Sequence, residues 1–491
     1  MNKKRLAYLI IILIGVLLYG MSAFFGFSYF DDQSLIIDNQ AIIKDTSNIG
    51  KIFVEDAFFS NQNFYYRPLL NISLMFDAQF AGINAWAYHL SNIAIHILVV
   101  LLLFSVLMKL KVSFKRSFFL SLFFLVHPAL VQAVAWIPGR NDTLLAVFIL
   151  ASFLFFLRYL KENKIINYVA CLLFFLLALF TKEAAVLFPF LLIFYYLFLS
   201  PKKIKASDKG LFVAGGAVVI FFWFIFRSLA IDGNLGSISS LFLSVVENSP
   251  ALIVNIGKFF FPFNLAIMPV LKDVNLIFGL GAVGVISFLA FSKRINKVWL
   301  AFGLLWFILF MLPSFVNPNP AEFYYLLLLE HRLYLPFIGI IFIFKDLQVP
   351  YFNNVNRVVR DKVLMLISVV ILASFSFLTI CHLPNFKDNI SFWSFAVLKS
   401  PNSPMTHRNL GAMLYFDGQL EKAEKQYNQA LDLNPLEPMA HNNLGVIYRD
   451  YGNFDMAEDE FLAELELKHS SSYYLAQDNL DYLLILKNKL R

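Results

Sequence analysis

Long apolar runs dominate this chain and constrain its fold more than any other feature. The first run, residues 6–30, contains no charged side chain and follows Lys3, Lys4 and Arg5. An uncharged run of this length predicts a helix that crosses a lipid bilayer. Further runs lie near residues 88–108, 117–135, 143–160, 165–181, 184–200, 211–230, 274–291, 298–315, 333–345 and 363–381. The sequence therefore predicts an all-α, polytopic membrane domain with about eleven spans.

The distribution of charge supports a membrane protein and predicts its orientation. Only 15% of the residues are charged and 59% are hydrophobic, whereas about 25% are charged in soluble domains. Basic residues concentrate in every second loop, so the positive-inside rule puts the N-terminus in the cytoplasm. An odd number of spans then puts the C-terminal region outside. The net charge of +7 therefore reflects topology, and we expect no nucleic-acid partner.

The last hundred or so residues have a different pattern, in which short motifs recur. Leu410 and Gly411 are followed 34 residues later by Leu444 and Gly445. This spacing, with small and large residues at fixed positions, is the tetratricopeptide pattern of two helices per unit. Residues around Trp393 match half of a preceding unit. The sequence thus predicts a short stack of paired helices.

These patterns divide the chain into two predicted domains. The membrane domain occupies residues 1–382, and its first outer loop, residues 31–88, contains amphipathic helices expected to lie on the membrane. Residues 383–491 form a short tetratricopeptide-repeat α-solenoid outside the cytoplasm, which ends in a capping helix at 472–489. The repeats could bind a peptide or protein, or they could form a structural lid on the membrane domain.

Polar side chains that a bilayer would exclude gather on the predicted outer side, in the loops or near the outer ends of the spans. The adjacent acids Asp31 and Asp32 end the first span. The others are Arg67, His127, Arg140, Asp142, Lys182, Glu183, Glu330, His331, Arg332 and Tyr334. Charges at a lipid boundary are unfavourable without partners, so a set on one face indicates a functional site. Each residue also has a structural interpretation, since an acid pair can end a helix and a lone Arg or Lys can extend to the lipid head groups.

The chemistry of such a site can be narrowed by what the sequence contains. It has no HExxH, Walker, CxxC or GxSxG motif, so zinc hydrolysis, ATP hydrolysis and serine-elbow chemistry lack support. An outward-facing site has no access to nucleotides, and a donor held in the membrane would be linked to a lipid. Cations would neutralise a phosphate leaving group, while a carboxylate would deprotonate an incoming hydroxyl. Attack opposite the phosphate would invert the anomeric centre.

Five segments carry a resemblance to a known family: YFDDQSLIIDN, YYRPL, HPALVQAVAWIPGRND, TKEAAVLFPFLLI and EHRLYLPFIG. They resemble the transmembrane and tetratricopeptide-repeat O-mannosyltransferases, which belong to the GT-C class of membrane glycosyltransferases. The resemblance covers nearly the whole chain and implies a GT-C-type membrane domain. It also implies a polyprenyl-phosphate-linked sugar, mannose or another hexose, as the donor. The implied acceptors are Ser or Thr hydroxyls of a protein or peptide, which the repeats could hold.

The same resemblance implies roles for individual residues. One member of the Asp31–Asp32 pair would act as the base, and Asp142 would be a second acid at the site. Arg140, Lys182, His331 and Arg332 would bind the donor phosphate, and Arg67 is a further cationic candidate. Our first choice of base is Asp32, with Asp31 orienting it or binding the acceptor, although the sequence does not separate the two. His127, Glu183, Glu330 and Tyr334 are additional candidates for the site.

We expect no cofactor. The Asp31–Asp32 pair could bind a divalent metal such as Mg²⁺, but the cations already available for the phosphate make a metal unnecessary. The composition, rich in Ile, Lys, Phe and Asn, is typical of a bacterial protein. We therefore expect a multi-pass protein of the bacterial cytoplasmic membrane with an extracytoplasmic active site.

Two alternatives remain open. An O-antigen-ligase-type oligosaccharide transferase also uses lipid-linked donors, and its chemistry would centre on His331 and Arg332 rather than on the aspartates. A lipid transporter or an envelope assembly scaffold would need no catalytic residues. A transporter is expected to have duplicated spans, and we see no such duplication in the sequence.

Overall fold

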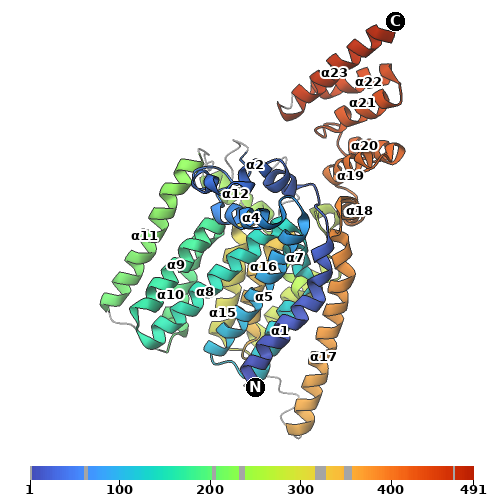
Figure 1. Cartoon of the computed structure of the whole chain (residues 1–491). Helices are drawn as coiled ribbons and strands as arrows, with labels where there is room; N and C mark the ends of the chain where they lie inside the picture. Colours follow the sequence, from blue (N-terminus) through green and yellow to red (C-terminus); the bar gives the residue numbers. More distant parts are fainter. Residues whose placement is uncertain are drawn as a thin grey trace. The chain divides into compact units, whose positions relative to one another are not determined.

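The computed structural model describes residues 3–59, 65–201, 206–231, 238–315, 328–347, 357–467 and 470–490 (Figure 1). All regular elements in these residues are helical, which confirms the all-α prediction. The helices form two compact units. The first comprises Met1–Leu265 with Asn275–Lys387, and the second comprises Asp388–Arg491 with the short segment Ala266–Val274.

The first unit is a bundle of apolar helices joined by short helical turns. Its longer helices are α1 (Lys3–Tyr19), α4 (Pro68–Ala81), α5 (Ala85–Lys109), α6 (Phe114–Leu125), α8 (Arg140–Glu162), α9 (Ile165–Thr181), α11 (Ala206–Ala230), α12 (Ile238–Asn248), α13 (Pro250–Phe260), α14 (Ile277–Phe291), α15 (Lys297–Met311), α16 (Tyr334–Phe344) and α17 (Arg357–His382). Its shorter elements are η1 (Gly20–Phe24), η2 (Gln33–Ile37), α2 (Gln40–Lys44), η3 (Thr46–Asn48), α3 (Ile49–Ile52), η4 (Pro128–Leu130), α7 (Val131–Ala135), η5 (Ile137–Gly139), η6 (Glu183–Leu187), α10 (Phe188–Phe194), η7 (Tyr195–Leu199), η9 (Leu312–Phe315), η11 (Glu330–Leu333) and η13 (Leu383–Phe386).

The number of membrane spans differs from the sequence prediction. Among the described residues, six helices are long and apolar enough to cross a bilayer, or seven if one bent pair is counted as a single span. The chain is therefore a multi-pass membrane protein, but the predicted count of about eleven spans is not confirmed. The difference lies in apolar helices that are broken or short: four have only 10–17 residues, and α16 has 11 residues.

One break matters for the site. The run predicted as a span at 117–135 is bent by 54° between α6 and the η4–α7 segment. Pro128 has no N–H to donate, and its ring disfavours a helical conformation of His127, which is extended at φ −72° and ψ 118°. The chain beyond the break stays buried through η5. Helix α8 consequently begins inside the protein, with Arg140 and Asp142 in its first turn.

Burial identifies α8 as the central helix of this unit. In its most apolar stretch 78% of the residues are buried, compared with 6% for both α11 and α17. Helix α8 packs against α5 and α9 (Figure 1). Nearby, α15 and α16 approach so closely that a Cβ atom at Gly303 would lie 2.4 Å from the carbonyl oxygen of Gly339. Glycine at both positions permits this contact, as is common between membrane helices.

The second unit is a stack of paired helices, as the 34-residue spacing predicts. Its helices are α18 (Asn389–Lys399), α19 (Pro404–Phe416), α20 (Leu420–Leu433), α21 (Ala440–Asp450), α22 (Phe454–Glu466) and α23 (Ser470–Leu490). A Cβ atom at Gly411 would lie 2.8 Å from the ring of Tyr427, and one at Gly445 would lie 2.8 Å from the ring of Phe461. The repeated glycines therefore allow the two helices of each unit to approach closely.

Candidate active site

The two adjacent acids differ in what surrounds them. Asp32 is buried, and its carboxylate accepts hydrogen bonds from the backbone N–H of Ser28 at 2.7 Å and of Phe30 at 2.9 Å. The hydroxyl of Ser28 donates to the same carboxylate at 3.0 Å. Burial raises the pKa of Asp32, while these hydrogen bonds act in the opposite direction. Asp32 thus holds the turn that follows the first helix.

Asp31 is only partly buried. Among the residues that the structure describes, none donates a hydrogen bond to its carboxylate. Burial, together with the adjacent charge of Asp32, raises the pKa of Asp31 to about 6, although Arg67 and Arg332 oppose this shift. A carboxylate with this pKa and no committed partner is well suited to accept a proton near neutral pH.

A second acid organises the opposite part of the site. Asp142 forms an ion pair with Lys182, whose Nζ lies 2.7 Å from Oδ1, and its Oδ2 lies 3.9 Å from Nε2 of His331. Burial and the positive charges of Arg332, Lys182 and Arg67 hold the pKa of His331 well below its ordinary value. The imidazole is therefore neutral at pH 7, which leaves the cations of this cluster to Lys and Arg.

Arg67 precedes α4 and reaches the same cluster. Its Nε lies 3.9 Å from Oε2 of Glu183, and the backbone N–H of Tyr66 donates to Oε1 of that glutamate at 2.8 Å. The guanidinium lies 4.2 Å from the ring centre of Tyr65. The side-chain amide of Asn141 is oriented so that its nitrogen donates to the carbonyl of Thr181 at 2.9 Å. Its oxygen then accepts from Nη1 of Arg67 at 3.0 Å. These contacts fix Arg67 beside the break between α9 and η6.

The buried segment after Pro128 links the two acids. The indole N–H of Trp136 donates to Oγ of Ser28 at 3.0 Å, and the ring of Trp136 lies 5.1 Å from that of His331. The side-chain oxygen of Gln132 accepts from the backbone N–H of His331 at 3.0 Å. The structure therefore brings together Asp31, Asp32, Arg67, Asp142, Lys182, Glu183, His331 and Arg332, which we call the acid–base cluster.

Several polar atoms in the acid–base cluster are buried without a hydrogen bond. Within the described part of the chain, Oδ2 of Asp142, Nδ1 of His331 and Nε of Arg67 make no hydrogen bond. Such atoms are unfavourable in a folded protein and are usually satisfied by a ligand or by water. The cluster therefore has the properties of a binding site for a polar ligand.

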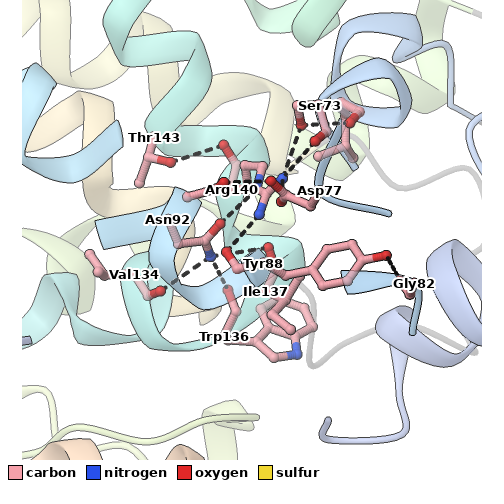
Figure 2. A network of polar contacts seen from close by, with 12 residues as sticks. Ser73, Asp77, Gly82, Tyr88, Asn92, Val134, Trp136, Ile137, Arg140 and Thr143 are labelled. Carbon is pink, nitrogen blue, oxygen red and sulfur yellow. Dashed lines mark hydrogen bonds and ion pairs between the residues drawn. The ribbon is translucent and has the colours of Figure 1, made fainter. Parts of the chain in front are cut away.

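Arg140, predicted to bind the donor phosphate, lies elsewhere (Figure 2). It is fully buried, and its Nη1 lies 2.6 Å from the carboxylate of Asp77. Its Nε donates to the side chain of Asn92 at 2.6 Å, and its other donors bond to the carbonyls of Tyr88 at 2.7 Å and Ser73 at 3.1 Å. The guanidinium is thus occupied in joining α4, α5 and α8. Asp77, a lone acid in an apolar stretch, is the sequence signal that could have indicated this partner.

Three further candidates also lie outside the acid–base cluster. Glu330 is buried and forms an ion pair with Lys258 at 2.9 Å, and His382 lies 3.7 Å from it. The hydroxyl of Tyr334 lies 2.6 Å from Nδ1 of His96. Nε2 of His127 lies 3.1 Å from the carbonyl oxygen of Phe259. We interpret all three as structural. In the parts of the chain that are described, no group of three or more His, Cys, Asp or Glu side chains is arranged to hold a metal.

Comparisons with known proteins agree with the architecture. Residues 411–452 match a family model described as a TPR repeat. The chain is 24% identical over 455 residues to Protein O-mannosyl-transferase F38B6.6 of Caenorhabditis elegans. This alignment covers 87% of the chain and 62% of the worm protein. It is 33% identical over 156 residues to Protein O-mannosyl-transferase TMTC3 of Homo sapiens, and 32% identical over 151 residues to Protein O-mannosyl-transferase TMTC2 of Homo sapiens.

The human alignments cover 30% of the chain in both cases, and 17% and 18% of the two relatives. The chain thus spans about three fifths of the worm relative and under one fifth of each human one. The resemblance to the transmembrane and tetratricopeptide-repeat O-mannosyltransferases that we inferred from the sequence is confirmed by these matches.

Proposed function

We propose that this homologue of the protein O-mannosyl-transferases is itself a membrane glycosyltransferase. It would transfer a hexose from a polyprenyl-phosphate donor to a Ser or Thr hydroxyl of a protein. We propose mannose as the hexose because the relatives are named O-mannosyl-transferases. Two findings support the proposal: the relationship to the worm enzyme extends over 87% of the chain, and a carboxylate without a hydrogen-bond donor among the described residues lies within a group of cations. The second finding is the observation that carries the proposed chemistry.

In the proposed reaction, Asp31 is the general base. The acceptor hydroxyl loses its proton to the Asp31 carboxylate, and its oxygen attacks the anomeric carbon. The bond from that carbon to the phosphate oxygen breaks, and polyprenyl phosphate leaves with the bonding electrons. Attack from the face opposite the phosphate inverts the anomeric centre. This reverses our sequence-based order of the two acids, because the carboxylate of Asp32 already accepts hydrogen bonds from its own loop.

The leaving phosphate would be bound by Arg67, Lys182 and Arg332. These cations would neutralise the negative charge that develops on the phosphate as the bond breaks. Such electrostatic stabilisation of the transition state is the largest single contribution to the rate enhancement of many enzymes. Asp142 would hold Lys182 through their 2.7 Å contact and would orient the neutral ring of His331. Because these three cations would already neutralise the phosphate, we propose a reaction without a metal or other cofactor.

The setting of the reaction follows from the charge of the loops. We propose that the acid–base cluster opens on the extracytoplasmic side of a bacterial cytoplasmic membrane, since the basic loops lie at the other ends of the helices. The polyprenyl chain would remain in the bilayer. The repeats would hold the protein acceptor outside the cytoplasm.

The direct test is an assay of the full chain reconstituted in liposomes. The donor is polyprenyl-phosphate mannose with a radioactive sugar, and the acceptors are a peptide containing Ser and Thr and a matched peptide containing Ala. Asp31→Asn should reduce transfer by about three to four orders of magnitude, as expected for loss of a general base and its charge. Asp38→Asn is the matched control, because this exposed acid lies on the same segment outside the acid–base cluster.

The outcomes separate the alternatives. Full activity of Asp31→Asn together with loss of activity in a His331 or Arg332 variant would favour an oligosaccharide ligase. No transfer by the wild type, together with an unchanged envelope glycoprofile in a host that lacks the protein, would favour a transporter or scaffold. A sugar mass other than that of a hexose in the glycoproteome would contradict the proposed donor.

A further inference from the structure

A cavity lies at the end of the bundle remote from the acid–base cluster. It has a volume of about 250 Å³ and is lined by Lys4 and Tyr8 of α1, Ser105, Met108 and Lys109 of α5, and Leu154 and Arg158 of α8. Asp31 follows the far end of α1, and Asp142 begins α8. At about 1.5 Å per residue, Asp142 and Arg158 are separated by roughly 24 Å along the helix. The cavity is therefore distinct from the proposed catalytic site.

Positive charge dominates the lining of this cavity. Three of its seven lining side chains are cationic, and none is acidic. The nearby Glu162 lies 3.5 Å from Lys109 and offsets one of the three charges. The guanidinium of Arg158 lies 4.9 Å from the ring centre of Phe155, which fixes its direction. The cavity thus keeps a net positive charge that suits one anionic group.

The polar and apolar groups of the lining are arranged for a ligand with both characters. The hydroxyl of Ser105 donates to the carbonyl of Leu101 at 2.7 Å, so the hydroxyl of Tyr8, 3.0 Å from it, is the one that can donate to a phosphate oxygen. Met108 and Leu154 supply the apolar part of the lining. Beyond the cavity, α1 presents exposed apolar side chains along its length, with Leu9 52% and Leu13 58% exposed. These side chains would contact hydrocarbon.

We propose that this cavity binds the phosphodiester head group of an anionic phospholipid, whose acyl chains lie in the surrounding bilayer. Basic pockets between membrane helices at a positively charged face suit such head groups. A lipid fits the site better than a free ion because Met108 and Leu154 give the polar cavity an apolar part, and α1, α5 and α8 are all long and apolar enough to cross a bilayer. The bound lipid would fasten α1, α5 and α8 to one another at the end opposite the acid–base cluster.

The test measures lipid retention by native mass spectrometry of the full chain released from detergent micelles. The probes are phosphatidylglycerol and phosphatidylcholine at equal concentration, with and without an excess of inorganic phosphate. The test variant is Lys109→Gln/Arg158→Gln. The control is Lys111→Gln/Lys164→Gln, which removes the same charge from two exposed positions outside the cavity lining. A third variant, Lys109→Arg/Arg158→Lys, keeps the charge.

The wild type should retain phosphatidylglycerol in preference to phosphatidylcholine. Each lost cation should lower the preference about fivefold, so the test variant should lose it, while the control and the charge-conserving variant should keep it. Equal retention of both lipids by the wild type, or unchanged preference in the test variant, would overturn the proposal. Displacement of the lipid by inorganic phosphate would overturn the lipid as the ligand. If the test variant does not fold, loss of preference in the charge-conserving variant would also count against the site.

Discussion

Replacing Asp31 by Asn should remove activity and at the same time stabilise the fold. The reason is that Asp31 is placed where its charge is unfavourable. Its pKa rises from 3.8 to about 6, mainly through burial and secondly through the charge of Asp32. A carboxylate whose charge the folded structure stabilises on balance would show the opposite shift.

The size of the effect follows from the shift. A rise from 3.8 to about 6, at about 1.4 kcal/mol per pKa unit, means that ionised Asp31 disfavours folding by about 3 kcal/mol. Asn has nearly the same shape and no charge, so Asp31→Asn should regain this amount at pH 7. The gain should be present in full above the folded-state pKa of about 6 and should be lost as the pH falls toward 3.8. At that pH the wild-type carboxyl is increasingly protonated in both states.

Asp32 provides the contrast. Asp32→Ala would leave the backbone donors of Ser28 and Phe30 and the hydroxyl of Ser28 without their acceptor. Each buried donor without a partner costs about 1–3 kcal/mol, so this variant should be less stable than the wild type by several kcal/mol. The two neighbours should therefore shift stability in opposite directions.

The assay is thermal unfolding of the full chain in micelles at several pH values, together with the rate of sugar transfer. Asp31→Asn should raise the apparent Tm at pH 7 and leave it nearly unchanged at pH 4. The wild-type rate should fall about tenfold per pH unit below about pH 6, because the base must be unprotonated. A lower Tm of Asp31→Asn at pH 7 would refute the reasoning, since Asp31 would then be a stabilising partner of the nearby arginines.

Three other predictions concern different parts of the molecule. Arg140→Met should destabilise the full chain by about 3–5 kcal/mol, because the carboxylate of Asp77 would remain buried without its cation. Adding Asp77→Asn to this variant should recover part of the lost stability. An unchanged unfolding midpoint of Arg140→Met would contradict the network in Figure 2. Lys182→Gln should lower kcat/KM for the lipid donor about 10²-fold; a change in the KM for the peptide alone would assign Lys182 to the acceptor. Gly411→Val should lower the stability of the repeats by about 1–3 kcal/mol because its side chain would meet the ring of Tyr427; unchanged resistance of the repeat unit to proteolysis would show that the helices can separate.

The charge pattern predicted which side of the bilayer the candidate residues share, and eight of the twelve side chains proposed from the sequence lie in the acid–base cluster. The sequence could not separate Arg140 from the rest. Its acid partner, Asp77, lies on a different helix, and only the folded chain brings the two within 2.6 Å. A sequence does not distinguish an arginine that is paired with an acid inside the fold from one that is available to bind a phosphate.

The spans show a similar limit. Apolar length predicts that a helix lies in the membrane, but it does not reveal where the helix is interrupted. Pro128 signals one break, and the 54° bend there turns what reads as one span into the buried segment that links Ser28 to His331. Asp31 and Asp32 are likewise adjacent in sequence and are distinguished only by the donors that the turn at Ser28 and Phe30 directs at one of them.

Charge balance explains why the base should be Asp31 in the proposed reaction. The acid–base cluster contains the cations Arg67, Lys182 and Arg332 and, besides the hydrogen-bonded Asp32, the acids Asp31, Asp142 and Glu183. A polyprenyl-phosphate sugar would enter with one negative charge, and its phosphate would gain a second as the sugar leaves. If Asp31 takes the acceptor's proton in the same step, one negative charge disappears as the other forms. The total charge of the buried site then stays constant, which matters because uncompensated charge is costly at low dielectric. At Asp32, by contrast, the proton would neutralise a carboxylate that accepts hydrogen bonds from Ser28 and Phe30, and these bonds would weaken at the moment of reaction.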